Sequence, residues 1–266
     1  MSVLTECRKP SLVLLHGWGM NHAVWQQWLP LLQSNWVVST PDLPGFGASQ
    51  QYPTPYQLDA VCQQLEAELP ESCVVCGWSL GGLVALALAA RNPKRVKALV
   101  LLAASPCFMS QDGWPGMAAT MFQQFRQQLS QNIHQTIQRF LAIQAMGSPS
   151  TREDIKCLRQ AILQQPAPQQ VALEGGLELL AGSDLRDELS QLNQPTFAGF
   201  GRLDTLVPIA LTEAIRACQP HALIHRFEHA SHAPFISHPQ ETAAWLHSIQ
   251  QSLFRKKAFN FGRDGQ

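Results

Sequence analysis

Three features are missing from this chain of 266 residues, and each absence excludes a class of protein. The chain has no net charge, because 19 Lys and Arg residues balance 19 Asp and Glu residues. This argues against nucleic acid as a partner. No apolar run approaches the roughly 18 residues of a membrane span, so we expect no membrane association. Residues 1–10 lack the charged-then-apolar order of a signal peptide. We therefore expect a soluble cytoplasmic protein.

Cysteine patterns that hold a metal are missing as well. The chain has seven cysteines, an odd number without regular spacing. Cys73 and Cys76 are three residues apart, but no second such pair and no histidine cluster follows. We therefore expect neither a metal site nor a cofactor. Both residues lie in an apolar run, where cysteine behaves as a small hydrophobe, and reduced thiols fit the cytoplasm.

The apolar residues that are present, 45 % of the chain, can fill a sizeable core. Short apolar runs alternate with helical patterns near both ends of the chain, which predicts an α/β fold with a mostly parallel sheet. Strands are expected at 11–15, 36–40, 73–78, 96–103, 195–201 and 222–227. Helices are expected at 21–31, 56–69, 83–90, 209–218 and 239–254.

The middle of the chain has a different composition. From about residue 108 to residue 182 it is rich in Gln, has no strand-like run and shows helical spacing throughout. Helices are expected there at 117–130, 133–146, 151–165 and 169–180. We therefore predict a core formed by residues 1–107 and 185–254, a helical cap at 108–184, and a loose tail at 255–266.

A serine elbow is the most informative local pattern. Residues 73–82 indicate a short buried strand, a sharp turn and the start of a helix, with Ser79 at the turn in the pattern G-x-S-x-G. Gly77, Gly81 and Gly82 supply the small neighbours needed where the strand and the helix nearly touch. The first N–H groups of the helix point at the serine and can stabilise a negative charge there.

Together the motifs resemble those of the α/β-hydrolase superfamily: an H-G-x-G loop, a D-x-x-G-x-G-x-S loop, the elbow, and then Asp and His loops in that order. This match covers nearly the whole chain. The sequence is similar in particular to the BioH family, the pimeloyl-[acyl-carrier protein] methyl ester esterases of biotin synthesis. The segments that carry this likeness are 15–20, 41–47, 77–83, 105–108, 139–147 and 232–239. Segment 139–147 matters most, because caps differ widely among α/β-hydrolases.

The resemblance implies a catalytic triad. Ser79 is the expected nucleophile, His232 the base that takes its proton, and Asp204 the carboxylate that orients the imidazole. The rival residues are His225, which falls inside a strand, His229, which precedes the matching position, and Asp42, whose glycine-rich setting indicates loop structure.

The oxyanion hole is expected to use the backbone N–H groups of Trp18 and Leu80. The Trp18 side chain can cover the acyl chain or simply fill the core.

The resemblance also implies where the substrate binds. The expected contacts are Trp18, Ser79, Leu80 and His232 in the core, and Phe140, Leu141, Ala142, Ile143 and Gln144 in the cap. Packing within the cap is the alternative role for the cap residues. Segment 120–165 carries five basic and two acidic residues, a net charge of +3. Arg139, Arg152, Lys156 and Arg159 are therefore expected to form a basic face for an acidic acyl carrier protein, with a solvated surface as the alternative.

We accordingly predict a serine carboxylesterase, acting as a monomer, that hydrolyses the methyl ester of pimeloyl-[acyl-carrier protein]. Two other hypotheses stay open. One is a general short-chain esterase or another hydrolase of this fold, such as a C–C bond hydrolase, because a triad alone does not fix the substrate. The other is a non-catalytic small-molecule receptor on the same scaffold.

Overall fold

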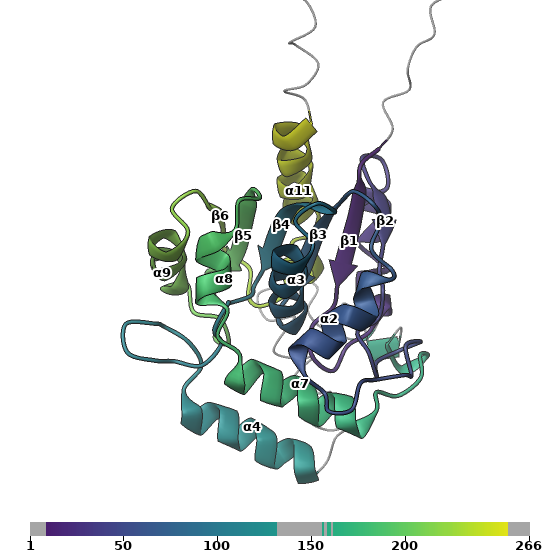
Figure 1. Ribbon diagram of the computed structural model, residues 1–266, viewed down its shortest axis with the longest axis vertical. Coiled ribbons are helices and arrows are strands. Elements are labelled where there is room, and N and C mark those ends of the chain that lie inside the picture. Colours follow the sequence, from purple (N-terminus) through teal and green to yellow (C-terminus); the bar gives the residue numbers. More distant parts are fainter. Residues whose placement is uncertain (1–8, 132–155, 157–158, 161, 255–266) are drawn as a thin grey trace, which may run out of the picture.

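Six parallel strands form one sheet in the computed structural model, which describes residues 9–131, 156, 159–160 and 162–254 (Figure 1). The strands are β1 (Ser11–Leu15), β2 (Val37–Ser39), β3 (Cys73–Trp78), β4 (Val96–Leu102), β5 (Thr196–Gly201) and β6 (Leu223–Phe227). Each lies where an apolar run predicted a strand. Their order across the sheet is β2-β1-β3-β4-β5-β6, which confirms the predicted α/β-hydrolase fold class.

Helices cover both faces of this sheet. The core helices are η1 (His22–Trp25), α1 (Leu29–Leu32), α2 (Leu58–Glu66), α3 (Leu80–Arg91), α8 (Arg186–Gln191), α9 (Leu211–Cys218), α10 (Pro234–Ser237) and α11 (Pro239–Phe254). Figure 1 shows α3, with α2 and α8 beside it, in front of the sheet and α11 behind it. As predicted for a helix that is apolar all round, α3 is buried from Leu80 to Ala89. Among the helices of the described ranges, none combines the length and apolar character that a bilayer crossing requires.

The predicted helix at 21–31 is wrong, because two short helices stand in its place. Asn21 does cap η1, where its side chain accepts from the Ala23 N–H at 3.1 Å. The chain then turns, and α1 starts afresh with Pro30 in its first turn. A proline ring carries no N–H and collides with the carbonyl four residues earlier in a continuous helix, so it is tolerated only at a helix start. The very short helices α8 and α10 were not predicted, since six and four residues show no periodic pattern.

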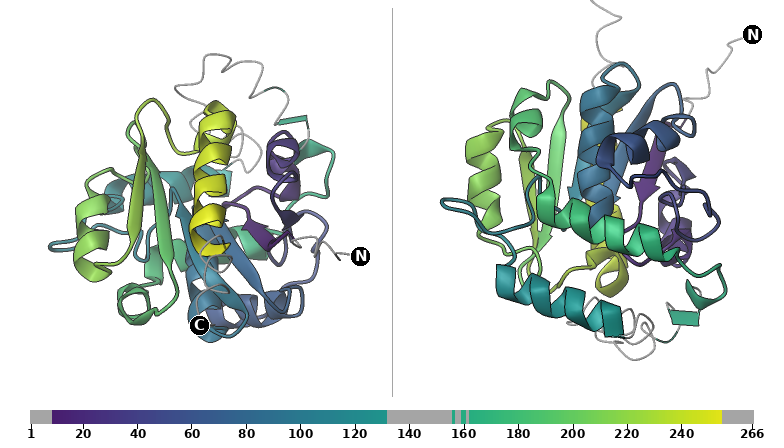
Figure 2. Two further views of the ribbon diagram at one scale, coloured as in Figure 1. Left: turned by 90° about the horizontal axis from the view of Figure 1, so that it is seen from above. Right: turned by 60° about the horizontal axis from the view of Figure 1, so that its bottom comes forward.

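The described part of the cap consists mainly of α4 (Ala119–Gln131) and α7 (Gln170–Gly182). Both helices lie across the carboxyl ends of the strands (Figures 1 and 2). The two chain segments that lead into and out of the cap meet in an isolated bridge between Cys107 and Asp184. The predicted helix at 133–146 and most of that at 151–165 lie outside the described residues.

The order of the strands creates a crevice. The chain leaves β1 toward the edge strand β2, and it leaves β3 toward β4 in the opposite direction. In sheets of this kind, ligands bind outside the carboxyl ends of the strands where the direction reverses. Trp18 follows β1 and Ser79 follows β3, so both stand at this point, directly under the cap.

Candidate active site

The turn that carries Ser79 is a strained backbone conformation held by close packing. Ser79 has φ +54° and ψ −121°, a region that L-residues avoid. A Cβ on Gly77 would overlap the backbone of Gly81, and a Cβ on Gly81 would overlap the carbonyl of Leu15. The Ser79 N–H donates to the carbonyl of Leu102 at 3.1 Å. The surroundings therefore fix the conformation that lifts the serine side chain out of the strand.

An imidazole and a carboxylate form a buried pair beside this turn. His232 Nδ1 lies 2.7 Å from Asp204 Oδ2, and both side chains are almost completely buried. Asp204 Oδ1 accepts from the backbone N–H groups of Leu206 at 2.8 Å and Val207 at 3.0 Å. An ionised carboxylate only accepts, so Nδ1 carries the shared proton and Nε2 is the acceptor nitrogen of the ring.

Contacts between two loops bring this pair together across 28 residues of sequence. The loop after β5 and the loop after β6 are joined by a hydrogen bond from the Leu203 N–H to the Ala230 carbonyl at 3.0 Å. Gly201 packs so tightly on the Ser231 carbonyl that a Cβ would overlap it. The packing of these two loops therefore sets the distance between Asp204 and His232.

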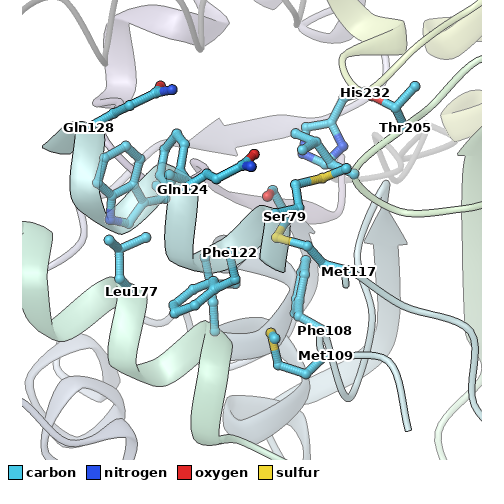
Figure 3. Close-up of a pocket in the computed structure, with 15 residues that line it drawn as sticks. Ser79, Phe108, Met109, Met117, Phe122, Gln124, Gln128, Leu177, Thr205 and His232 are labelled. Atoms are coloured by element: carbon cyan, nitrogen blue, oxygen red, sulfur yellow. The ribbon is translucent and has the colours of Figure 1, made fainter. Parts of the chain in front are cut away.

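Ser79 and His232 line one pocket of about 260 Å³. Figure 3 shows their side chains at the same end of it. Most of the remaining wall is apolar and comes from the cap, including Met121, Phe122 and Phe125 on α4 and Leu177 and Leu180 on α7. A concave, mostly apolar site with a few polar groups is the usual form of a small-molecule site.

The two residues expected to form an oxyanion hole lie at a helix start and in a loop. Leu80 is the first residue of α3, so its N–H has no acceptor within the helix and lies at the positive end of the helix dipole. Gly17 brings the loop after β1 against the elbow, since a Cβ there would lie 3.3 Å from Ser79 Cβ. Trp18 is the next residue in this loop and lines the pocket.

The Trp18 side chain contacts both cap helices. Its Nε1–H donates to the Leu173 carbonyl of α7 at 2.8 Å, and its ring meets Phe125 of α4 edge-on at 5.1 Å between centroids. The indole is buried and also lines the pocket. Trp18 therefore links the loop after β1 to the cap and also forms part of the pocket wall.

A second His–Asp cluster holds the loops beneath the pocket. His16 is fully buried, where its Nδ1–H donates to the Gly17 carbonyl at 2.8 Å and its Nε2 accepts from the Leu43 N–H at 3.0 Å. Burial lowers the pKa of the His16 imidazole, so this ring stays neutral. Asp42 accepts from the backbone N–H and the imidazole of His22. These contacts occupy Asp42 with loop structure, the role that its sequence context indicates.

The rival histidines lie away from the pocket. His225 is inside β6, where its ring stacks on Trp245 at 5.6 Å and its Nε2 lies 3.9 Å from Glu241. His229 is exposed on the loop that follows. Neither lines the pocket that holds Ser79. In the part of the chain that the structure describes, no group of three or more His, Cys, Asp or Glu side chains is arranged to hold a metal ion.

Several residues named from the sequence cannot be placed. Phe140, Leu141, Ala142, Ile143, Gln144, Arg139 and Arg152 lie outside the described residues. Lys156 and Arg159 are described, and both are exposed.

Sequence reasoning did not single out the walls on α4 and α7. A signal was available, because Met121, Phe125 and Gln128 recur every three to four residues and therefore share one face of α4.

The contact made by Trp78 was also missed. From the sequence its ring could cover the acyl chain, fill the core or support the site residues from behind, and the structure shows its Nε1–H donating to the His232 carbonyl at 2.8 Å. These two residues are 154 positions apart, so no local pattern could have revealed the contact.

Comparison with known proteins agrees with this architecture. The family model described as alpha/beta hydrolase fold matches residues 10–239. Among solved structures, an esterase from Exiguobacterium antarcticum superposes with a TM-score of 0.80 at 22% identity, covering 91% of this chain and 92% of its own. A bromoperoxidase from Bacillus anthracis superposes with a TM-score of 0.81 at 20% identity over the same shares of the two chains. At such low identity these structures establish the fold alone.

Sequence relatives are much more similar. A pimeloyl-[acyl-carrier protein] methyl ester esterase from Aeromonas hydrophila is 51% identical over 233 residues, which is 87% of this chain and 92% of the relative. The protein of the same name from Aliivibrio salmonicida is 44% identical over 247 residues, 93% of this chain and 94% of the relative. This chain therefore belongs to the α/β-hydrolase family and, within it, to the group of pimeloyl-[acyl-carrier protein] methyl ester esterases.

Proposed function

We propose that this protein is a serine carboxylesterase that hydrolyses the methyl ester of pimeloyl-[acyl-carrier protein] to the free carboxylate and methanol, a step of biotin biosynthesis. One observation carries the proposal. Ser79 and His232, whose imidazole is paired with Asp204, line one apolar pocket in a chain that is 51% identical to an esterase of that name.

The first half of the reaction forms an acyl-enzyme. The Ser79 hydroxyl attacks the ester carbonyl while His232 Nε2 takes its proton, because a neutral hydroxyl is too weak a nucleophile by itself. Asp204 stabilises the imidazolium through Nδ1–H. The carbonyl oxygen becomes negative and accepts from the N–H groups of Trp18 and Leu80, at the positive end of α3. His232 then gives the proton to the departing methoxy oxygen, and methanol leaves.

The second half repeats these steps with water. His232 takes a proton from a water molecule, the resulting hydroxide attacks the acyl-enzyme carbonyl, and the same two N–H groups hold the oxyanion. Collapse of this intermediate returns the proton to Ser79 Oγ and frees the pimeloyl carboxylate. Atoms and protons balance in each half without a cofactor.

The proton transfers fix how the substrate lies in the pocket. The leaving alcohol has to face His232, which protonates it. The acyl chain then extends to the opposite side, along the wall formed by Trp18, Phe125 and Leu177. This wall is apolar, as the methylene chain of a pimeloyl group requires. The end of the chain that is bound to the carrier leaves the pocket along α4.

The acyl carrier protein is the expected macromolecular partner. The exposed cations Lys156 and Arg159, with Arg139 and Arg152, would present a basic face to that acidic protein and steer its approach. We further propose that the enzyme acts in the cytoplasm as a monomer. The five cysteines in the described ranges are all free thiols, which fits a reducing compartment.

A substrate comparison tests this function. The purified enzyme should release methanol from methyl-pimeloyl-[acyl-carrier protein] with a kcat/KM well above that for p-nitrophenyl esters of similar chain length. The gene should also restore growth without biotin to a strain that lacks this esterase. Equal kcat/KM values for both substrates, with no rescue, would favour a general carboxylesterase. Ligand binding without any turnover would favour a receptor.

A further inference from the structure

Two glutamines on α4 stand out among the pocket residues. Besides Ser79 and His232, the polar side chains that line the described pocket are those of Gln124, Gln128 and Thr205. The two glutamines are four residues apart and lie on one face of α4, with a rise of about 6 Å between them. In Figure 3 the Gln124 amide lies between Gln128 and the end of the pocket that holds Ser79.

We propose that Gln124 and Gln128 form a subsite for the amide-bearing thioester arm that links the acyl chain to its carrier. This inference rests on the proposed function. An acyl carrier protein holds its acyl group as a thioester on an arm with two secondary amides in series, separated by two methylene groups. Successive amide groups in such a β-amino acid unit are about 5 Å apart when extended, close to the spacing of the two glutamines.

The orientation of the substrate places this arm on α4. Because the methoxy group faces His232, the opposite end of the acyl chain passes Trp18 and Phe125 toward solvent. Both glutamines are exposed at the mouth of the pocket. A carboxamide side chain donates and accepts at once, so it can pair with either face of a secondary amide. A carboxylate or an ammonium group would pair with only one.

The test compares two small substrates that differ only in the arm. Methyl pimelate is joined as a thioester either to pantetheine, which has both amides, or to butanethiol, which has none, and methanol release is followed. The wild-type enzyme should prefer the pantetheine thioester. In the double variant Gln124→Leu/Gln128→Leu this preference should fall about tenfold, because two modest hydrogen bonds to the arm are lost. The kcat/KM for the butanethiol ester should stay within about twofold of the wild-type value. Gln123→Leu, an exposed glutamine of α4 outside the pocket lining, is the matched control and should keep the preference.

The outcomes separate this inference from the proposed function. If the double variant keeps the wild-type preference, or if Gln123→Leu loses it equally, the subsite is refuted. If the wild-type enzyme releases methanol from neither thioester nor from the carrier-bound substrate, the proposed function itself fails.

A different set of contacts assigns a role to Trp78. The residue precedes Ser79 in the chain, and its Nε1–H donates to the backbone carbonyl of His232 at 2.8 Å. Its ring lies 5.8 Å from the His232 imidazole between centroids, and a Cβ on Gly17 would lie 3.1 Å from the ring. Trp78 thus touches the nucleophile, the base loop and the oxyanion loop, while itself fully buried.

We infer that Trp78 is a positioning residue that sets where the imidazole of His232 stands relative to Ser79. The His232 carbonyl is in a buried segment, so loss of the indole donor costs this loop a buried hydrogen bond and favours its rotation. That rotation would move the Nε2 atom of His232 away from the Ser79 hydroxyl. Catalysis is sensitive to displacements of about 1 Å, whereas substrate binding through the cap wall is not affected by this change.

Trp25 provides a matched control for this inference. It belongs to the same aromatic cluster, with its ring 6.2 Å from that of Trp78 and 4.4 Å from that of Phe235. It is equally buried, but its Nε1–H finds no acceptor within the described residues. Trp25→Phe and Trp78→Phe therefore remove similar packing, and only the second removes a hydrogen bond.

The measurements are Tm, kcat, KM and the rate at which a fluorophosphonate labels Ser79. Both variants should lower Tm, and Trp78→Phe should lower it further because it also loses a buried hydrogen bond. Trp78→Phe should lower kcat and the labelling rate about tenfold with KM within about twofold, whereas Trp25→Phe should leave all three near wild type. Equal effects of both variants on kcat and labelling would overturn the inference. Should Trp78→Phe not fold, benzothienylalanine at position 78 removes the N–H alone and keeps the ring shape.

Discussion

Replacing Asp204 with Asn should abolish most of the activity while leaving the fold almost unchanged. The reason lies in how the carboxylate is held. Its Oδ1 accepts from the N–H groups of Leu206 and Val207, and its Oδ2 faces His232 Nδ1. An asparagine in this position would point its carbonyl oxygen at the two backbone donors, since its NH₂ group cannot accept from them.

The consequence for catalysis follows from that orientation. The NH₂ group of the introduced asparagine would face His232 and donate to Nδ1, which forces the proton onto Nε2. The imidazole then presents a donor to Ser79 and cannot take its proton. A change of tautomer of this kind in a serine protease triad lowers kcat about 10⁴-fold, which is about 5.5 kcal/mol in the activation free energy.

The assay is kcat for methanol release by Asp204→Asn, with Tm measured on the same preparation. We expect a loss near 10⁴-fold and a Tm within a few degrees of wild type, because both backbone bonds to the side chain persist. Asp204→Ala, which loses those bonds as well, should lower Tm further. Retention of more than a tenth of the wild-type kcat by the folded Asn variant would refute the reasoning.

Three further predictions concern the scaffold. Gly81→Ala should prevent folding or lower Tm by more than about 10 °C, because its Cβ would overlap the carbonyl oxygens of Leu15 and His16; a Tm near wild type in a melting experiment would contradict this. The free energy of unfolding should fall as pH drops below about 6.5, because His16 binds a proton in the unfolded chain but stays neutral while it is buried in the folded one. Denaturant titrations at pH 5 and pH 7 measure this loss of stability, and a smaller loss in His16→Asn would support the assignment to His16. Burial raises the pKa of Cys73 to about 11 and that of Cys76 to about 12, so iodoacetamide at pH 8 should label neither until the protein unfolds, as peptide mass spectrometry can check.

Features of the fold that depend on residues close together in the sequence could be predicted from it. The buried strands are visible in the sequence as apolar runs. The elbow is visible as glycines that flank Ser79, because the strand and the helix approach so closely there that a side chain would not fit. The order of the Ser, Asp and His loops along the chain identified candidates that the structure brings to the carboxyl edge of one sheet. The break in the helix at 21–31 was missed although Pro30 signals it, because the apolar spacing across the break stays helical.

Contacts between distant parts of the chain could not be predicted in the same way. The Trp78 indole meets the His232 carbonyl, and the Trp18 indole meets the Leu173 carbonyl, each across more than 150 residues. Backbone carbonyls are present at every position, so the sequence does not mark which one a buried indole will find. The pocket walls on α4 and α7 are hidden for a related reason. Apolar residues such as Phe125 and Leu177 show the same helical spacing whether they line a ligand site or fill a core.

The role of Ser79 is the centre of this mechanism, and methanol release tests it most directly. Wild-type enzyme and Ser79→Ala are mixed with methyl-pimeloyl-[acyl-carrier protein], and methanol is quantified over time alongside a circular dichroism spectrum that verifies folding. The mechanism predicts turnover by the wild type and, for the folded variant, a rate at least about 10⁴-fold lower. Methanol release by Ser79→Ala at a rate close to that of the wild type would contradict it.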